Sequence, residues 1–409
     1  MGGDYIYHPA MDIPSPTRYA ERALSHIQVV AKNGRGSATA AEKMAADYVV
    51  TQLHSLDIPD VKQQPFSGER SLWLFVALAF GLALVGHAAY WLLRQPIGAL
   101  LAVILSWLFF GFSGYLAWCK FTNVDYPLRN ALPHAPSQNV IARLPPSQEA
   151  NRKLVLIAHL DSHRAVFWFA SDFMVRLFTP IAITAMFGIY LAIPVYGLAA
   201  LTHWPFFGWL GIFLALLHFI AWFTGVTADL GQYSPGANDN ASAVGTVLAL
   251  AERIKAQPLK NTEVWLAFTG CEETSGDGIL ALIGEYGTSL KEALFLDFEM
   301  VGIGDEVSYI RQEGNIKRLT IPEETEAFIK KVGEQDGLKI AEGPLVGAAT
   351  ECSILWKYGY RAVCLVAHRK GSNVLPEWHR LTDTPDHLEV GSLERVHKLA
   401  WEVLQRFDQ

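Results

Sequence analysis

Two adjacent carboxylates, Glu272 and Glu273, follow directly after a short apolar run. The run, Val264-Trp-Leu-Ala-Phe268, is typical of a buried strand. Two carboxylates at the mouth of a buried strand are costly unless a cation holds them. One of them could bind a metal ion while its neighbour, pointing elsewhere, transfers a proton. Such a pair is more often a solvated turn, so the interpretation depends on the rest of the chain.

Other residues of metal-binding type follow predicted strands or open a helix in the same way. They are His159, Asp161, Asp239, Asp297, Glu299, His379 and Asp383. In an open α/β sheet, ligands bind beyond the carboxyl ends of the strands, where these loops converge. Two histidines and several carboxylates suit zinc, and a bridging carboxylate suits two ions. Asp161, two residues after His159, is placed to orient that imidazole through its other nitrogen.

Each residue also has a structural explanation when it is taken alone. Asp239 could cap its helix, Asp297 could simply end a strand, and His379 could be a surface residue. His163 lies four residues after His159, but a ligand pair at that spacing needs a helix, and this segment is a strand exit. We therefore expect His163 to have a structural role.

The elements that must position these residues alternate along the chain. Strands are predicted at 60–66, 138–144, 153–158, 264–268, 293–298 and 362–366, and helices at 38–56, 240–256, 278–287, 323–335 and 391–407. This alternation predicts an α/β fold with a mainly parallel, mixed sheet sandwiched by helices.

Four long segments without formal charge interrupt this pattern. They are residues 71–93, 97–119, 177–201 and 206–226. Each is long enough to cross a hydrocarbon core of about 30 Å, and buried helices of a soluble core are rarely this long. Because short turns join them in pairs, they predict two transmembrane hairpins, hence an integral membrane protein with four helices and the lipid bilayer as a partner.

Charge limits the remaining possibilities. The net charge of −7 and the lack of a long Lys/Arg run argue against nucleic acid as a partner. Basic residues flank the predicted spans mainly on one side, at Arg70, Lys120, Arg129, Arg164 and Arg176, against Arg94 in the far loops. The positive-inside tendency therefore predicts a cytoplasmic α/β domain. The sequence leaves the oligomeric state unknown.

Five motifs resemble those of a known family, the co-catalytic di-zinc aminopeptidases of metallopeptidase family twenty-eight. The motifs are His159-x-Asp161, Gly236-Ala-Asn-Asp239-Asn240-x-Ser242, Glu272-Glu273, Leu296-Asp-Phe-Glu299-Met-Val-Gly302 and His379-Arg-Leu-Thr-Asp383-Thr384. They occur in the order found in the family, and the resemblance covers nearly all of the sequence outside the long apolar segments. It implies a zinc-exopeptidase-like fold.

The resemblance also implies a role for each residue. One zinc ion would be held by His159 and Glu299, a second by Glu273 and His379, and Asp239 would bridge the two. Glu272 would be the general base that takes a proton from the attacking water and later donates one to the leaving amine. Asp161 would support the site from behind His159, and Asp383 would also support the ligands without binding a metal ion itself.

The chain is then expected to divide into five segments. Residues 1–70 begin the peptidase domain, 71–119 form the first transmembrane hairpin, 120–168 continue the peptidase domain, 169–228 form the second hairpin, and 229–409 complete the peptidase domain.

The expected function is a membrane-bound zinc aminopeptidase that removes N-terminal residues from peptide substrates. The fourth ligand departs from the usual pattern, since the family commonly has Asp where this chain has Glu299, and Asp297 is the alternative. Two other functions stay open. Glutaminyl cyclases, which are acyltransferases, resemble this family but bind one zinc, and some relatives are non-catalytic membrane scaffolds. The complete two-metal ligand set favours hydrolysis.

Overall fold

A mixed eight-stranded sheet forms the centre of the α/β part of the molecule, in the order β1-β2-β4-β3-β5-β10-β6-β9. The computed structural model describes residues 16–409 except 315, 335–337, 339, 344–348 and 373. The strands are β1 (Asp60–Glu69), β2 (His134–Leu144), β3 (Arg152–His159), β4 (Thr262–Thr269), β5 (Leu294–Glu299), β6 (Glu306–Tyr309), β9 (Ile340–Glu342) and β10 (Arg361–His368). Strands β4, β3, β5 and β10 run parallel to one another as neighbours.

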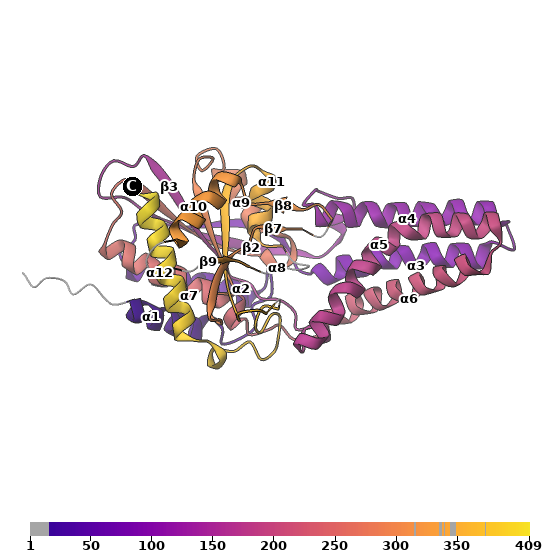
Figure 1. The fold of residues 1–409 in the computed structure, drawn as a ribbon, viewed down its shortest axis with the longest axis horizontal. Coiled ribbons are helices and arrows are strands. Elements are labelled where there is room, and N and C mark those ends of the chain that lie inside the picture. The colour runs from indigo at the N-terminus through magenta and orange to yellow at the C-terminus, as the bar shows by residue number, and fades with distance from the viewer. Residues whose placement is uncertain (1–15, 315, 335–337, 339, 344–348, 373) are drawn as a thin grey trace, which may run out of the picture.

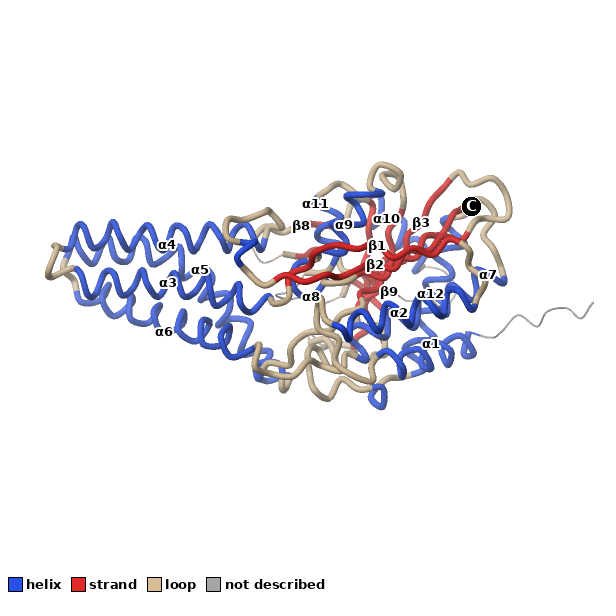
Figure 2. Tube along the Cα trace, turned by 180° about the vertical axis from the view of Figure 1, so that it is seen from behind, coloured by secondary structure: helices blue, strands red, loops and turns tan. Residues whose placement is uncertain are grey.

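Helices flank this sheet, as Figures 1 and 2 show. They are α1 (Pro16–Val30), α2 (Ala40–Ser55), α7 (Ser242–Ala256), α8 (Glu272–Ser275), α9 (Asp277–Tyr286), α10 (Glu323–Gly333), α11 (Glu351–Lys357) and α12 (Val390–Phe407). Residues 242–251 of helix α7 are all buried, because its small and aliphatic residues lie between the sheet and α1. The predicted α/β fold with a mainly parallel sheet is thus confirmed.

The four long apolar segments form a separate bundle that projects from one end of the α/β body (Figure 1). Its helices are α3 (Leu72–Leu93), α4 (Ala99–Phe121), α5 (Asp172–Thr202) and α6 (Pro205–Ala228), and each is long and apolar enough to cross a membrane. Large apolar side chains on the outside of the bundle are exposed, among them Leu92, Leu100, Leu201 and Trp209. A water-soluble surface rarely carries so large an apolar area.

Strand directions place the bundle at one particular edge of the sheet. Strand β1 is antiparallel to β2, and β2 is antiparallel to β4, so β1 runs in the same direction as β4 and β3. The first helical hairpin begins just after β1 ends at Glu69, and the second follows the end of β3 at His159. Both hairpins therefore leave from the edge at which the parallel strands have their carboxyl ends.

A buried ionic cluster joins the first hairpin to the sheet. The Glu69 carboxylate, at the end of β1, is 2.5 Å from Lys120 Nζ and 2.8 Å from Arg129 Nε, and it accepts a hydrogen bond from the Tyr126 hydroxyl at 3.1 Å. Arg129 also pairs with Asp277 at the start of α9. Because Lys120 belongs to the last turn of α4, this cluster fixes the base of the bundle to the α/β body.

Several predicted elements differ from the structure in extent. The strands beyond β5, namely β6, the pair β7 (Gln312–Glu313) and β8 (Leu319–Thr320), and β9, were not predicted, nor was α11. These elements are two to seven residues long, too short for hydrophobic periodicity to reveal. The predicted helix 323–335 ends at Gly333, and residue 335 lies outside the described part of the chain, as do the first 15 residues of segment 1–70.

Candidate metal centre

The metal-type residues predicted from the strand ends meet at one edge of the sheet. His159 is the last residue of β3, Glu299 the last of β5, and Glu272 and Glu273 form the first turn of α8, just after β4. His379 lies in the loop between β10 and α12. Since these four parallel strands are neighbours in the sheet, their carboxyl ends bring the side chains together.

Asp239 stands between two histidines and offers one carboxylate oxygen to each. Asp239 Oδ1 is 3.5 Å from His159 Nε2, and Oδ2 is 3.3 Å from His379 Nε2. Each histidine has a further carboxylate of its own. Glu299 Oε2 lies 3.4 Å from His159 Nε2, and Glu273 Oε2 lies 3.2 Å from His379 Nε2. The arrangement contains two His-carboxylate pairs that share Asp239.

Asp161 connects the first of these pairs to the Glu272-Glu273 turn. His159 Nδ1 faces the Asp161 main-chain oxygen at 3.1 Å and the Asp161 carboxylate at 3.4 Å. The same carboxylate accepts hydrogen bonds from the backbone N–H groups of Glu272 and Glu273, at 3.2 and 3.1 Å, and from Ser37 Oγ at 2.6 Å. Asp161 thus orients the imidazole and holds the first turn of α8 in place.

The turn that carries Asp239 is fixed by groups on both sides. Asp383 accepts hydrogen bonds from the backbone N–H groups of Asn238 and Asp239, at 2.7 and 3.0 Å. Gly236 begins the turn with a φ of +63°, and a Cβ there would lie 2.4 Å from the Asp239 main-chain oxygen, so the position requires glycine. The buried Arg35 guanidinium donates to the main-chain oxygens of Leu160 and Gly236 and so ties this turn to the end of β3.

Burial and mutual repulsion set the electrostatics of the acidic residues. Burial, with the nearby Asp239 charge, raises the pKa of Glu273 to about 8, and burial raises the pKa of Glu299 to about 8 although His159 opposes the shift. Burial also raises the pKa of Glu272 well above its usual range. The carboxyl groups are therefore crowded together with too little positive charge among the protein side chains to stabilise them all as anions.

This donor set fits zinc. Zinc is bound by histidine nitrogen and carboxylate oxygen, and a dication supplies the positive charge that the crowded carboxylates lack. Glu273 Oε1 is buried and has no hydrogen-bond partner among the described residues, as expected for an oxygen reserved for a ligand. The residues that would hold the ions are His159, Asp239, Glu273, Glu299 and His379.

Two candidates lie outside this ligand set. Asp297 is two residues before Glu299 on β5, and no short contact joins it to either histidine in the described part of the chain. His163 lies beside the set: its ring stacks on the His379 ring with 3.8 Å between centroids, its Nδ1 lies 2.9 Å from the Arg164 main-chain oxygen, and one of its ring nitrogens lies within 4.8 Å of ligand atoms of Glu273 and His379.

Other contributors were not predicted from the sequence. Arg35 and Ser37 support the site from the loop between α1 and α2, far from any motif. Trp73, in the first turn of α3, packs edge-on against His163 at 5.6 Å between ring centroids. No local pattern marks such residues, since their role depends on contacts formed after folding.

Comparisons with solved structures agree with this fold. The structure of a glutaminyl cyclase from an Acidobacteriales bacterium is similar, with a TM-score of 0.56, 12% identity and coverage of 99% of each chain. A zinc aminopeptidase from Bacillus subtilis has a TM-score of 0.55 at 14% identity, covering 97% of this chain and 96% of that one. A leucine aminopeptidase precursor from Bacteroides thetaiotaomicron has a TM-score of 0.55 at 12% identity, covering 97% and 99%. At these identities the likeness establishes the fold.

The sequence itself carries a family signal in its C-terminal half. A search of curated protein sequences gives no significant match. Residues 219–404, which include Asp239, Glu272, Glu273, Glu299 and His379, match the family model described as Peptidase family M28. Residues 219–404 are therefore similar to Peptidase family M28, and the fold of the chain is similar to those of zinc aminopeptidases and glutaminyl cyclases.

Proposed function

We propose that this protein is a membrane-embedded zinc aminopeptidase that hydrolyses the N-terminal peptide bond of its substrates. The observation that carries the proposal is the position of Asp239, whose two carboxylate oxygens face His159 and His379 separately. A bridging carboxylate between two such pairs is what a two-metal hydrolytic site requires. The Peptidase family M28 match supports the same reaction class.

The ligand assignment follows the two His-carboxylate pairs. His159 and Glu299 would hold one zinc ion, His379 and Glu273 the other, and Asp239 would bridge them. Two bound ions would polarise the scissile carbonyl and favour the ionised form of water. Asp161 and Asp383 hold the ligands in place through the hydrogen bonds described above.

Glu272 is the group that would move the proton. Its Oε2 lies 3.9 Å from His159 Nε2, beside the ligands, and its backbone N–H is held by Asp161. Burial raises its pKa, which makes its carboxylate a stronger proton acceptor. The proton taken from water would then be delivered to the nitrogen of the leaving amine.

The test compares Glu272→Gln with wild type on a panel of aminoacyl-anilides, with metal content measured on both. We expect two equivalents of zinc in each protein and a loss of activity of about 100-fold or more in the variant, since general acid–base catalysis contributes roughly 10²–10⁴-fold. Glu292→Gln, an exposed residue just before β5 at the far end of that strand, is the matched control and should behave as wild type. Unchanged activity in Glu272→Gln would remove Glu272 as the base.

A glutaminyl cyclase is the second candidate, because its fold is among those most similar to this chain. A peptide with an N-terminal glutamine separates the two functions. An aminopeptidase releases free glutamine and a shortened peptide, whereas a cyclase returns a peptide of the same length that has lost ammonia. One zinc per chain with the second outcome would favour the cyclase. Absence of metal would favour a non-catalytic scaffold.

The membrane assignment rests on the four-helix bundle. All four helices meet the length and composition of a membrane span, and their outward side chains are largely apolar. We propose that both hairpins cross the bilayer, that they are inserted into one peptidase domain, and that this domain faces the cytoplasm. Labelling of a cysteine introduced at Arg94 in sealed cells, compared with one at Gln409, tests the orientation. Labelling of the cysteine at position 409 by a reagent outside the cells would show that the domain faces the opposite side of the membrane.

A further inference from the structure

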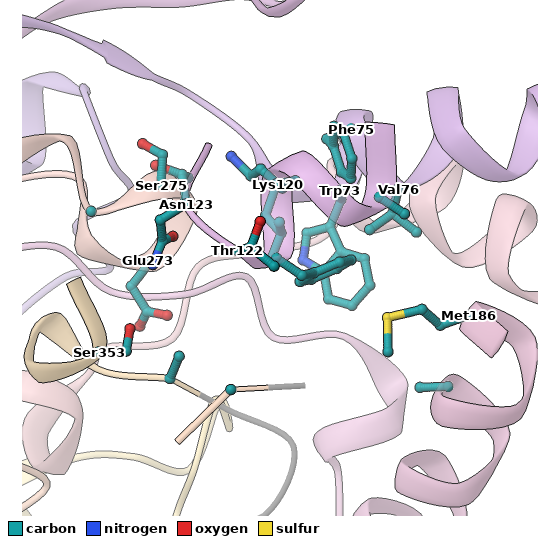
Figure 3. A pocket seen from close by; sticks show the side chains of 18 of the residues that line it. Trp73, Phe75, Val76, Lys120, Thr122, Asn123, Met186, Glu273, Ser275 and Ser353 are labelled. Carbon is teal, nitrogen blue, oxygen red and sulfur yellow. The ribbon is translucent and has the colours of Figure 1, made fainter. Parts of the chain in front are cut away.

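The cavity at the metal centre continues into the helical bundle. It has a volume of about 720 Å³, and its walls include both the ligand Glu273 and residues of α3, α5 and α6. In Figure 3, Glu273 lies at one side of the cavity, Trp73, Val76 and Met186 lie at the other, and Lys120 stands between them. The cavity therefore has a polar compartment at the site and a second compartment inside the bundle.

Apolar side chains line the bundle compartment. They are Leu72, Trp73, Phe75, Val76, Ala79, Phe80, Ala117, Phe178, Ile181, Ala182, Ile183, Ala185, Met186, Ile220 and Ala221. Two threonines also contribute to this wall, but their hydroxyls already donate within their helices. Thr179 Oγ1 donates to Val175 O, and Thr224 Oγ1 donates to Ile220 O and accepts from Trp168 Nε1.

The depth of this compartment follows from the helix positions that line it. On α3 the lining runs from Leu72 to Phe80, and on α5 from Phe178 to Met186. At 1.5 Å per residue, each stretch covers roughly 12 Å along its helix axis. Both stretches belong to the end of the bundle nearest the α/β body, so an occupant can reach the metal centre and the bundle interior at once.

The chemistry of the walls decides what can occupy this space. A peptide backbone would bring a series of N–H and C=O groups into a region where, among the described apolar wall residues, Trp73 Nε1 is a donor without a partner. Each backbone group left unsatisfied there costs several kcal/mol. A charged N-terminus would cost more. A hydrocarbon chain has no such groups and gains from burial with every methylene.

A row of aromatic rings connects the two compartments. Trp73 of α3 contacts His163, and His163 stacks on the ligand His379. Among the polar residues that line the cavity, Asn123 and Ser275 lie on the side of Glu273, and Thr122 lies next to Trp73 (Figure 3). A molecule with a polar head and one apolar chain therefore matches the cavity from end to end.

We infer that the substrate is an amphiphilic amide that is dissolved in the membrane, with its hydrocarbon chain in the bundle and its amide bond at the metal centre. The inference rests on the proposed amide hydrolysis and adds the substrate class. In the reaction the C–N bond breaks, the carbonyl carbon gains the hydroxyl of water, and the leaving nitrogen gains a proton. The free carboxylate and amine that result each carry a new polar end.

The first test is a chain-length series with the full chain in lipid nanodiscs. In the first arm the probes are alanine n-alkylamides from ethyl to dodecyl. In the second arm they are N-acyl-alanines of matched length. Comparison of the two arms shows whether the hydrocarbon chain lies on the nitrogen side or the carbonyl side of the amide. In one arm we expect kcat/KM to rise about four-fold per methylene until the chain fills the bundle compartment. A flat series in both arms would overturn the inference, while hydrolysis of the short amides would leave the proposed function intact.

Two substitutions that fill the compartment separate binding in the cavity from partition into the bilayer. Ala182→Trp on α5 and Ala221→Trp on α6 each add bulk to the lining, and Leu191→Trp on the exposed face of α5 is the matched control. We expect the octyl-to-ethyl ratio of kcat/KM to fall about 16-fold, the equivalent of two methylenes, in the first two variants and not in the control. Partition of the substrate into the bilayer does not depend on which variant is present, and a folding defect lowers the rates for the octyl and ethyl substrates alike. An octyl-to-ethyl ratio that stays the same in the first two variants would therefore overturn the inference.

A binding experiment gives a readout that does not depend on turnover. A dodecylamide with a diazirine near the chain end is photolysed with the Glu272→Gln protein, and the labelled peptides are mapped by mass spectrometry. We expect labelling within residues 72–80 and 178–186 that excess dodecanamide prevents. Labelling confined to outward residues such as Leu100 and Leu216, without competition, would overturn the inference whatever the protein hydrolyses.

Discussion

The buried carboxylate of Glu69 provides a quantitative test of how the bundle is joined to the Glu272-Glu273 turn. Its side chain is 1% exposed and faces Lys120, whose side chain is 8% exposed, and Arg129. The main-chain oxygen of Glu69 accepts a hydrogen bond from Thr274 Oγ1 at 2.9 Å, directly after the Glu272-Glu273 pair. The same residue therefore anchors the end of α4 and positions the turn that holds Glu272.

We expect Glu69→Gln to destabilise the protein by about 3–5 kcal/mol, the usual cost of removing one partner from a buried ion pair. The substitution keeps the size of the side chain but removes the carboxylate that pairs with the buried Lys120 ammonium, while the partly exposed Arg129 keeps Asp277 and Asp125 nearby. At about 2.1 cal/mol/K of unfolding entropy per residue, an α/β domain of about 300 residues loses about 1.6 °C of unfolding temperature for each kcal/mol. The expected decrease in Tm is thus roughly 5–8 °C.

The matched control is Asp60→Asn, at the other end of the same strand. Asp60 pairs with Arg143, but the two side chains are 29% and 39% exposed, so the pair contributes about 0–1 kcal/mol. Thermal unfolding in detergent, followed by intrinsic fluorescence, compares the two variants with wild type. If both variants changed Tm by the same small amount, the cluster at Glu69 would not anchor the bundle and the reasoning would be refuted.

Three further predictions concern the site and its support. Asp383→Asn places an amide N–H against the backbone donors of Asn238 and Asp239, so we expect the affinity for zinc to fall by about 10–100-fold. Competition with a chelator measures this affinity. The control Asp386→Asn changes an exposed residue and should leave the affinity unchanged. Removing zinc should lower Tm more at pH 8 than at pH 6. Glu273 and Glu299 have raised pKa values in the folded protein, so the folded state binds more protons than the unfolded state, and the zinc-free protein loses stability as the pH rises from about 4.5 to 8. An equal decrease in Tm at both pH values would contradict this. Burial lowers the pKa of His26 to about 4, so the folded state binds fewer protons than the unfolded state between about pH 6.5 and 4. Acidification through that range should therefore lower the free energy of unfolding by up to roughly 3 kcal/mol. When Tm is measured against pH, it should fall less steeply in His26→Gln than in wild type, and parallel curves would refute this role of His26.

Local patterns in the sequence were enough to identify most of the elements. Short apolar runs such as 264–268 predict buried strands because a strand covered on both faces needs no polar positions. Long uncharged segments such as 71–93 predict helices that could span a bilayer because length and composition alone define such a span. The order of polar residues after the strands also indicated a shared edge, since parallel strands align their carboxyl ends.

The sequence could not show which carboxylate completes each histidine pair. Asp297 and Glu299 lie two residues apart on β5, and side chains at that spacing point to the same face of a strand. The structure separates them, because Glu299, at the end of the strand, reaches His159 Nε2. The second role of Asp161, which accepts hydrogen bonds from the backbone of the Glu272-Glu273 turn, was equally hidden.

The tertiary structure also decided where the bundle stands relative to the site. Composition indicates four apolar helices, but not that they leave the sheet from the carboxyl edge of its parallel strands. That position follows from the direction of β1, which pairing with β2 and β4 fixes through contacts distant in sequence. Trp73 of α3 reaches His163, and the cavity passes from Glu273 into the bundle, because of this arrangement. The kinds of chemistry and the apolar helices were determined locally by the sequence, whereas their meeting in one cavity depended on strand pairing between distant segments.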